Sequence, residues 1–294
     1  MFRNSRRQIL GPSRAAKKRR RSFLAKASLV AVGLFMLAAY LSWLSYSDKV
    51  RIDKVYVTGV ETINAGEIED GIWKKLDGKI WRIILRNNSL LVNTTDLENF
   101  FLAEYPKIYA INVKRKDLKT LKVQIVERRP FALWCDGRSV GDSEYFDADL
   151  CYHIDSEGYM FAKGIFDSAL FQLYGAPLAS EISAQKASST TERINWVGYY
   201  FMEPQTFARS VAFAADMQSR QINTYGIKVG SENFFELLLD DGGVIRFDPN
   251  SDLIALAKDI ALSYEKKIMS DEPSNEIEYI DARFPNKILF KFLE

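Results

Sequence analysis

The sequence is poor in the side chains from which many active sites and metal centres are built. Its 294 residues include one histidine, His153, and two cysteines, Cys135 and Cys151. Without a second histidine or a cysteine cluster, no zinc site of ordinary spacing can be assembled. The sequence also lacks a glycine-rich phosphate-binding loop and a serine-nucleophile elbow. These absences argue against an enzyme that depends on zinc, a nucleotide or an activated serine.

The acidic residues do not form a recognisable site either. A run at 142–149 contains Asp142, Glu144, Asp147 and Asp149, but it lacks the glycine and the final bidentate glutamate of an EF-hand. We interpret it as a solvated loop, with weak calcium binding as the alternative. Nothing in the spacing indicates the paired carboxylates of a hydrolase. His153 alternates with its neighbours in CYHID, which is typical of a strand residue. We therefore expect no enzyme, no catalytic or metal-binding residues and no cofactor.

Cys135 and Cys151 flank the acidic run. If the two short strands around them pair as a hairpin, a disulfide can close the loop in an oxidising compartment. Two buried free thiols would produce the same sequence pattern. Both alternatives stay open from the sequence alone.

Positive charge is concentrated at the start of the chain. Residues 1–26 contain ten basic residues and no acidic one, although the whole sequence has 40 basic and 38 acidic residues. The remaining residues are therefore net acidic, with 30 basic against 38 acidic side chains. A basic block that directly precedes an apolar segment is typical of the cytoplasmic side of a membrane anchor.

An uncharged stretch of 21 residues follows, ASLVAVGLFMLAAYLSWLSYS, between Lys26 and Asp48. As a helix it spans about 31 Å at ~1.5 Å per residue, which matches a hydrocarbon core of ~30 Å. Tyr40, Trp43 and Tyr46 lie at its far end, where amphipathic rings favour the membrane interface. We expect a cytoplasmic tail at 1–26, a single transmembrane helix at 27–47 and an external part from residue 48 onward.

Three other interpretations of this region stay open. Ser45-Tyr46-Ser47 resembles a signal-peptide cleavage site, although the apolar stretch is longer than the core of a cleaved signal. The sequence RRSFLAK, from Arg20, resembles a twin-arginine export signal, against which the long apolar stretch argues. A basic block is also typical of nucleic-acid binding. Its position directly before the apolar stretch favours an orientation signal, and we expect no nucleic-acid partner.

Residues 48–128 predict one compact unit with the order β-α-α-β-β. The segment RIDKVYVT (51–58) reads as a strand that ends at Gly59, and Asn64 with Glu67 predicts a helix start. Thr95 with Glu98 predicts a second helix start. Two alternating strands follow at 109–114 and 121–127. The apolar face expected for the first helix consists of Ile68, Ile72 and Leu76.

Residues 129–294 predict a second, strand-rich α+β domain. FALWCD and CYHIDSEGYMFA read as short strands, and 203–221 reads as a helix. FFELLLDDGGVIRF is a strong hairpin signal, because Asp241-Gly242-Gly243 lies between two apolar runs. Ser251 is expected to cap a long helix, and EIEYIDARF and KILFKF are expected to be the last two strands. The fold class predicted for the whole chain is α+β.

These segments together resemble the FtsQ/DivIB family of bacterial cell-division proteins. The β-α-α-β-β unit, which begins IDKVYVTGVETI and ends LKTLKVQIVERRPFALW, is similar to the POTRA domain of that family. An ID..G..F signature is matched by Ile154-Asp155, Gly158 and Phe161, and a Tyr-Ile-Asp-x-Arg-aromatic run is matched by residues 279–284. Each motif is loose by itself, but they occur in the family's order along essentially the whole chain.

The resemblance implies a non-enzymatic scaffold of the divisome, held in the cytoplasmic membrane and located at the division septum. Its implied partners are FtsB/DivIC-like and FtsL-like single-pass proteins, and through them the septal peptidoglycan synthase complex. In the family the last strands and the preceding helix contact the partner, which adds a strand to the sheet edge. Carried over to this sequence, the implied partner-binding residues are Arg283, Phe284, Asn286, Leu289, Phe290 and Phe292.

The last strand itself supports an edge of this kind. Ile288, Phe290 and Phe292 alternate with Lys287, Leu289 and Lys291, so one face is apolar and the other carries the lysines. Added strands gain affinity from main-chain hydrogen bonds and specificity from alternate side chains. Either face is a candidate, and the phenylalanines are also suited to the domain's own core.

Pro285 departs from the family pattern and cannot donate a ladder hydrogen bond. The pairing register of the last strand, as the resemblance implies it, can therefore be shifted by one residue. The ERRP segment, 127–130, is interpreted as a hinge. Two rival functions remain: a POTRA-bearing protein of envelope transport or assembly, and a membrane-anchored envelope enzyme.

Overall fold

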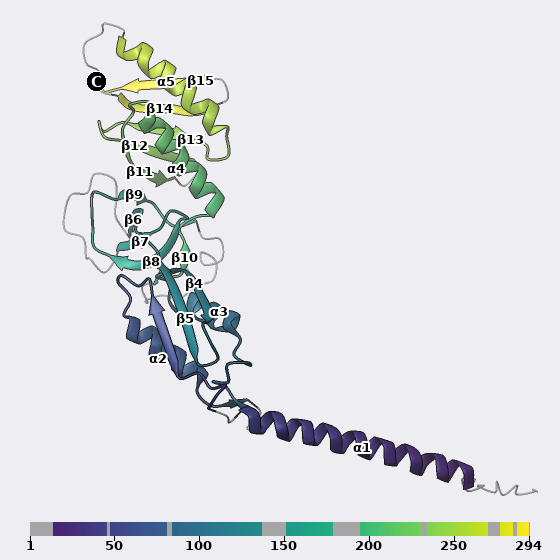
Figure 1. Ribbon diagram of the computed structural model, residues 1–294. Coiled ribbons are helices and arrows are strands. Elements are labelled where there is room, and N and C mark those ends of the chain that lie inside the picture. Colours follow the sequence, from purple (N-terminus) through teal and green to yellow (C-terminus); the bar gives the residue numbers. More distant parts are fainter. Residues whose placement is uncertain are drawn as a thin grey trace, which may run out of the picture. The chain divides into compact units, whose positions relative to one another are not determined.

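The computed structural model describes residues 14–45, 48–80, 84–136, 151–178, 195–230, 234–269, 277–284 and 287–293. They form a mixed α+β protein, as the sequence predicts (Figure 1). The chain divides into two compact units. We call Met1–Phe100 with Ile111–Ile125 the N-terminal unit, and Phe101–Ala110 with Val126–Glu294 the C-terminal unit.

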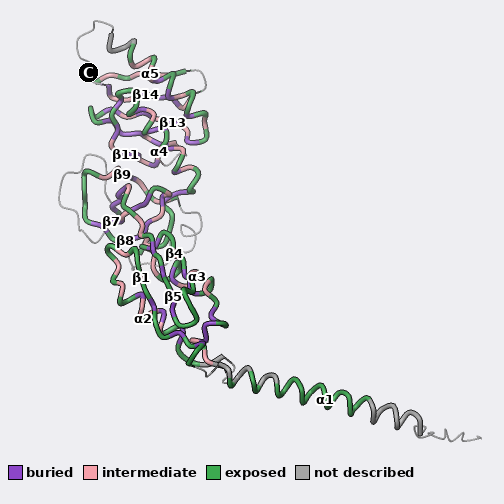
Figure 2. The backbone as a smooth tube through the Cα atoms, in the orientation of Figure 1, coloured by how far each residue is buried: buried purple, intermediate pink, exposed green. Residues whose placement is uncertain are grey.

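The first helix, α1, runs from Arg14 to Ser45. Every α1 side chain that the structure describes is exposed, including Leu29, Phe35 and Trp43 (Figure 2). Among the described residues, no helix is both long enough and apolar enough to span a membrane. The transmembrane helix expected at 27–47 stays a prediction.

A helix and a three-stranded sheet form the centre of the N-terminal unit. The strands β1 (Lys54–Thr58), β5 (Thr120–Glu127) and β4 (Ile108–Arg115) lie in that order, with β1 parallel to β5. The helix α2 (Ala65–Leu76) begins where the Asn64 side chain accepts a hydrogen bond from the Gly66 N–H. Its expected apolar face is confirmed, because all three of its residues are buried: Ile68, Ile72 and Leu76.

The remainder of this unit differs from the prediction in detail. A small hairpin of β2 (Lys79–Ile80) and β3 (Ile84–Leu85) stands between the helices α2 and α3 (Thr94–Glu104). The cap of α3 is Asn93, whose Oδ1 accepts the N–H groups of Thr95 and Asp96. The capping box predicted for Thr95 and Glu98 is therefore wrong, since Glu98 instead accepts the N–H of Val113 in β4.

The C-terminal unit contains a ten-stranded sheet in the order β10-β8-β7-β6-β9-β11-β12-β13-β14-β15. Most neighbours pair antiparallel, but β9 is parallel to both β6 and β11, and β13 is parallel to β14. The strands are β6 (Ala132–Cys135), β7 (Cys151–Ile154), β8 (Tyr159–Gly164), β9 (Phe171–Tyr174), β10 (Tyr199–Tyr200), β11 (Thr224–Val229), β12 (Phe235–Leu239), β13 (Val244–Phe247), β14 (Ile277–Phe284) and β15 (Lys287–Phe292).

Two helices, α4 (Pro204–Ser219) and α5 (Leu253–Met269), lie on the same face of strands β11 to β15 (Figure 1). Phe213 of α4 and Ile260 of α5 belong to one core cluster with Ile227, Ile245 and Ile280 of the strands. The opposite face of these strands carries polar side chains such as Lys228, Glu236 and Arg246, together with the buried Leu238. The core thus explains why apolar residues alternate in the sequence of β14 and β15.

The hairpin expected around residue 242 is confirmed as β12 and β13, and Gly242 has the positive φ of +92° that its turn requires. The cap expected at Ser251 is displaced by one residue. Asp252 Oδ1 accepts the N–H of Ala255, whereas the Ser251 hydroxyl donates to the carbonyl of Asp248. Of the two alternatives for the cysteines, the structure has the disulfide: Cys135 and Cys151 are directly opposed on β6 and β7.

Candidate protein–protein interface

β15 is the outermost strand at one end of the ten-stranded sheet. It pairs antiparallel with β14, and no other described strand adjoins it. Its register runs from Lys287 opposite Phe284 to Phe292 opposite Ile277, with two irregularities in β14. The opposite end of the sheet is β10, which has only two residues. Among the described strands, β15 is therefore the longer of the two sheet edges and offers six residues of main chain to an added strand.

The alternation predicted for β15 is confirmed, and the structure assigns its two faces. Ile288, Phe290 and Phe292 are half-buried and pack against the core cluster. The rings of Phe290 and Phe292 have their centroids 6.5 Å apart and their planes 16° from parallel. Leu289, by contrast, is exposed, as are the lysines on either side of it. The two phenylalanines thus belong to the domain's own core, and the outward face is the one that carries the lysines.

The other residues carried over from the family have different surroundings. Arg283 forms an ion pair with Asp281, with Nη2 2.7 Å from Oδ2, and its guanidinium lies 4.6 Å from the ring centroid of Phe234. Phe284 is half exposed at the end of β14. Asn286 lies outside the described residues. The structure therefore brings Arg283, Phe284, Leu289, Phe290 and Phe292 onto two neighbouring strands, but on different faces.

Asp281 holds the side chain of Arg283 in place on β14. It is buried, and its Oδ1 also accepts the N–H and Nε–H groups of Arg283. The hydrogen bonds from Arg283 hold the pKa of this carboxyl below its ordinary value, against the opposing effect of burial. Because the guanidinium is held by two carboxylate oxygens, its position relative to β14 is defined before any partner binds.

Two separate groups of ion pairs lie on the sheet, one on β11 to β13 and one on β14 and β15. Glu236 of β12 accepts from Arg246 of β13 at 2.9 Å and lies 3.3 Å from the ammonium of Lys228 on β11. At the edge, Lys291 Nζ lies 2.6 Å from Glu278 Oε2, and this hydrogen bond raises the pKa of Lys291. The second group reaches the edge strand β15, on which Lys291 is exposed. This edge is suited to a partner that supplies both main-chain hydrogen bonds and acidic side chains.

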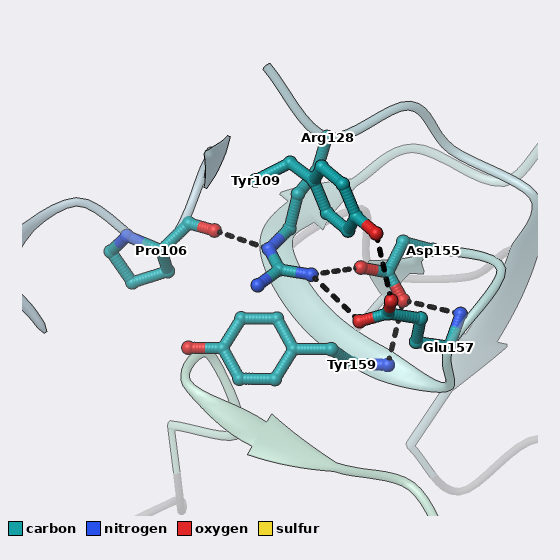
Figure 3. Close-up of polar contacts among 6 residues, drawn as sticks. All are labelled: Pro106, Tyr109, Arg128, Asp155, Glu157 and Tyr159. Carbon is teal, nitrogen blue, oxygen red and sulfur yellow. Dashed lines mark hydrogen bonds and ion pairs between the residues drawn. The ribbon is translucent and has the colours of Figure 1, made fainter. Parts of the chain in front are cut away.

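A second polar cluster lies elsewhere in the C-terminal unit, around Arg128 (Figure 3). The guanidinium donates to Asp155, lies 3.8 Å from the carboxylate of Glu157, and donates through Nε to the carbonyl of Pro106. It also lies 4.2 Å from the ring centroid of Tyr159. The Arg128 and Asp155 side chains are only 12% and 5% exposed, so this ion pair is nearly removed from water.

Asp155 also organises the turn that joins β7 to β8. Its Oδ1 accepts the N–H groups of Glu157 and Tyr159 (Figure 3). Gly158 completes the turn with a φ of +86°, and a Cβ there would lie 2.9 Å from the Phe207 ring. The Asp155 and Gly158 positions of the ID..G..F signature are therefore explained physically, as a carboxylate-capped turn that requires glycine.

Sequence reasoning found Asp155 but not its partner. Arg128 was interpreted as part of a hinge, whereas the structure joins it to Asp155 across 27 positions of sequence. The available signal is an arginine just after a strand and two residues before Pro130, but pairing it with one of 38 acidic residues requires the fold. The Tyr109 hydroxyl, which donates to Glu157 and has a raised pKa from that bond, could not be assigned from the sequence either.

Two residues considered for chemistry have structural surroundings. His153 is half-buried on β7, and burial lowers the pKa of its imidazole. The acidic residues at 142–149 lie outside the described residues. Across the described ranges, no group of three or more histidine, cysteine, aspartate or glutamate side chains is arranged to hold a metal ion.

Comparison with known proteins does not extend these observations: no family model matches the sequence, and no curated protein matches it.

Proposed function

We propose that this chain is a non-enzymatic scaffold of the bacterial divisome, of the FtsQ/DivIB type. In this proposal, it binds FtsB/DivIC-like and FtsL-like partners by adding a strand to β15 and thereby contributes to the control of septal peptidoglycan synthesis. The POTRA assignment of residues 48–128 and the strand-rich domain at 129–294 belong to the same proposal. The observation that carries it is a six-residue outer strand that has an exposed, lysine-bearing face.

Membrane attachment enters this proposal from the sequence and from the exposed apolar side chains of α1. The basic residues at 1–26 and the uncharged stretch that follows favour a single-pass protein with a cytoplasmic N-terminus and an external C-terminal part. The exposed apolar side chains of α1, such as Phe35 and Trp43, need a covering that the described residues do not supply. A septal location in the cytoplasmic membrane follows from the proposed partners.

The β15 edge supports strand addition rather than side-chain docking by phenylalanine. Because Phe290 and Phe292 are committed to the core, specificity on this strand comes from Lys287, Leu289 and Lys291. Exposed lysines increase the rate of association with an acidic partner and disfavour basic ones. The main chain of β15 supplies most of the affinity.

The test is a binding measurement between the full-length chain in nanodiscs and the cognate FtsB-type ectodomain, by isothermal titration calorimetry. We expect Leu289→Glu and Lys291→Glu each to weaken binding by about tenfold, equivalent to ~1.4 kcal/mol. Leu90→Glu is the matched control, because Leu90 is also an exposed leucine and belongs to the N-terminal unit. Unchanged affinity in both β15 variants would refute this edge as the docking site.

A further inference from the structure

Lysines gather at one end of the three-stranded sheet in the N-terminal unit. β1 and β5 run parallel, with Lys54 opposite Thr120 and Tyr56 opposite Lys122, so the two strands start side by side. The turn from β4 into β5 adjoins the same end, because the Lys54 N–H donates to the carbonyl of Lys119 at 3.1 Å. The beginnings of β1 and β5 and the end of β4 therefore share one edge of the unit.

The exposed lysines of this edge are Lys54, Lys114, Lys116, Lys119 and Lys122, which we call the lysine end. The Lys116 ammonium lies 5.9 Å from the Tyr56 ring centroid, which places it on the same face as β1's outward residues.

Two acidic residues lie within the lysine end. Asp53 is 3.9 Å from Lys119, and both groups are half exposed. The Asp117 carboxylate accepts the N–H of Lys119 within the turn. The outward residues at the opposite end of these strands, Thr58 and Gln124, are uncharged. Among the outward residues of β1 and β5, positive charge is thus confined to one end, with Lys54 and Lys122.

The chain enters the sheet at this same end. Lys54 opens β1, and the last residue of α1 is Ser45. A fully extended chain covers at most ~3.3–3.6 Å per residue, so the connection reaches about 30 Å. A membrane that holds α1 therefore lies within about 30 Å of the lysine end, whatever conformation the connection adopts.

We propose that the lysine end binds the anionic phospholipid headgroups of the membrane that holds α1. This inference rests on the membrane attachment in the proposed function. The ammonium of lysine is a compact point charge on a flexible stem, which suits a laterally mobile layer of phosphodiesters. Each lysine close to an anionic surface strengthens attraction by about fivefold. Membrane contact of this kind would restrict the orientations of the N-terminal unit relative to the lipid surface.

The experiment uses the full-length chain in nanodiscs of phosphatidylcholine, with or without phosphatidylglycerol. A fluorophore is attached at Leu118→Cys, in the turn of the lysine end, and its quenching by lipids with a nitroxide headgroup is measured. The native cysteines form a buried disulfide and do not compete for the label. A second label at Gln124→Cys reports on the opposite end of the same strand.

We expect phosphatidylglycerol to increase quenching at position 118 severalfold and to leave position 124 unchanged. Replacing Lys114, Lys116 and Lys122 by glutamine should abolish the increase, whereas Lys258→Gln on α5 of the C-terminal unit should retain it. Equal quenching in both lipids would overturn the inference, as would an increase that survives the triple replacement.

Three further outcomes separate the alternatives. If quenching does not depend on lipid charge while a fluorescent polyglutamate peptide binds and requires the same lysines, the partner is an acidic protein segment and the lipid assignment is wrong. If the chain is not retained in the nanodiscs at all, membrane attachment fails and this inference fails with it. Retention without quenching overturns the lipid contact alone and leaves the proposed function intact.

Discussion

The rings of Phe290 and Phe292 lie nearly parallel on the same face of β15, and both pack against the core of the C-terminal unit. The two residues that the sequence favours as anchors for a partner therefore also hold the edge strand in place. Loss of binding in a phenylalanine variant is consequently ambiguous unless stability is measured as well.

The first prediction separates these roles. We expect Phe290→Ala to reduce the free energy of unfolding by about 2 kcal/mol, below the ~3–5 kcal/mol of a fully buried phenylalanine because the ring is only half-buried. Leu289→Ala, on the exposed face, should change it by less than about 0.5 kcal/mol. Urea denaturation of the full-length chain measures both values. Equal losses in the two variants would show that the faces are assigned incorrectly.

The second prediction concerns Arg128. Removing one partner of a nearly buried ion pair leaves the other charge uncompensated, so Arg128→Ala should cost about 3–5 kcal/mol of stability. The double variant Arg128→Met with Asp155→Leu should regain part of the lost stability, because apolar packing replaces the ion pair. The recovery is incomplete, since the N–H groups of Glu157 and Tyr159 lose their acceptor. Arg129→Ala is the control, since that neighbour is exposed. A thermal unfolding series in which Arg128→Ala behaves like Arg129→Ala would contradict this account.

The third prediction is a dependence of stability on pH. The pKa of Asp281 is lowered in the folded protein by its hydrogen bonds from Arg283. The unfolded state therefore binds this proton more readily, and the stabilisation is fully present above the ordinary value of 3.8. It is lost as the pH falls through the lower folded value. Denaturant titrations from neutral pH to pH 2 should show a steeper acid loss in the native chain than in Asp281→Asn. Identical slopes would be inconsistent with the pairing.

The fourth prediction concerns the disulfide. Cys135 and Cys151 are 16 positions apart, and a cross-link that closes a loop of this size contributes about 3 kcal/mol by restricting the unfolded chain. Reduction, or replacement of both cysteines by alanine, should lower the stability of the C-terminal unit by that order. Calorimetry with and without reductant measures the difference. An unchanged transition temperature after complete reduction would argue that the pair contributes little.

The elements with strong local signals were the ones that the sequence predicted well. The helix after Asn64 and the hairpin around Gly242 follow from one apolar face and from one glycine turn, and both were found. The caps at Thr95 and Ser251 were wrong by one or two residues, because several neighbouring polar side chains compete for the same N–H groups.

The features that the sequence missed depend on contacts between distant segments. β9 and β11 pair with each other in parallel and are separated in the chain by α4, so no local pattern marks their register. The Arg128 cluster likewise joins segments near residues 106, 128 and 155. For the candidate interface, the alternation of β15 predicted two faces correctly, but only the packing of α4 and α5 could decide which face turns inward.

The strand order limits the sequence in which the strands of the C-terminal sheet can pair. From β11 onward each strand lies beside its predecessor in the chain, and β15 comes after all the others. A strand cannot pair before its neighbour exists, so the outer edge of the sheet is completed only when β14 is already in place. A partner that recognises β15 as a sheet edge would therefore bind only molecules in which β14 and β15 have already paired.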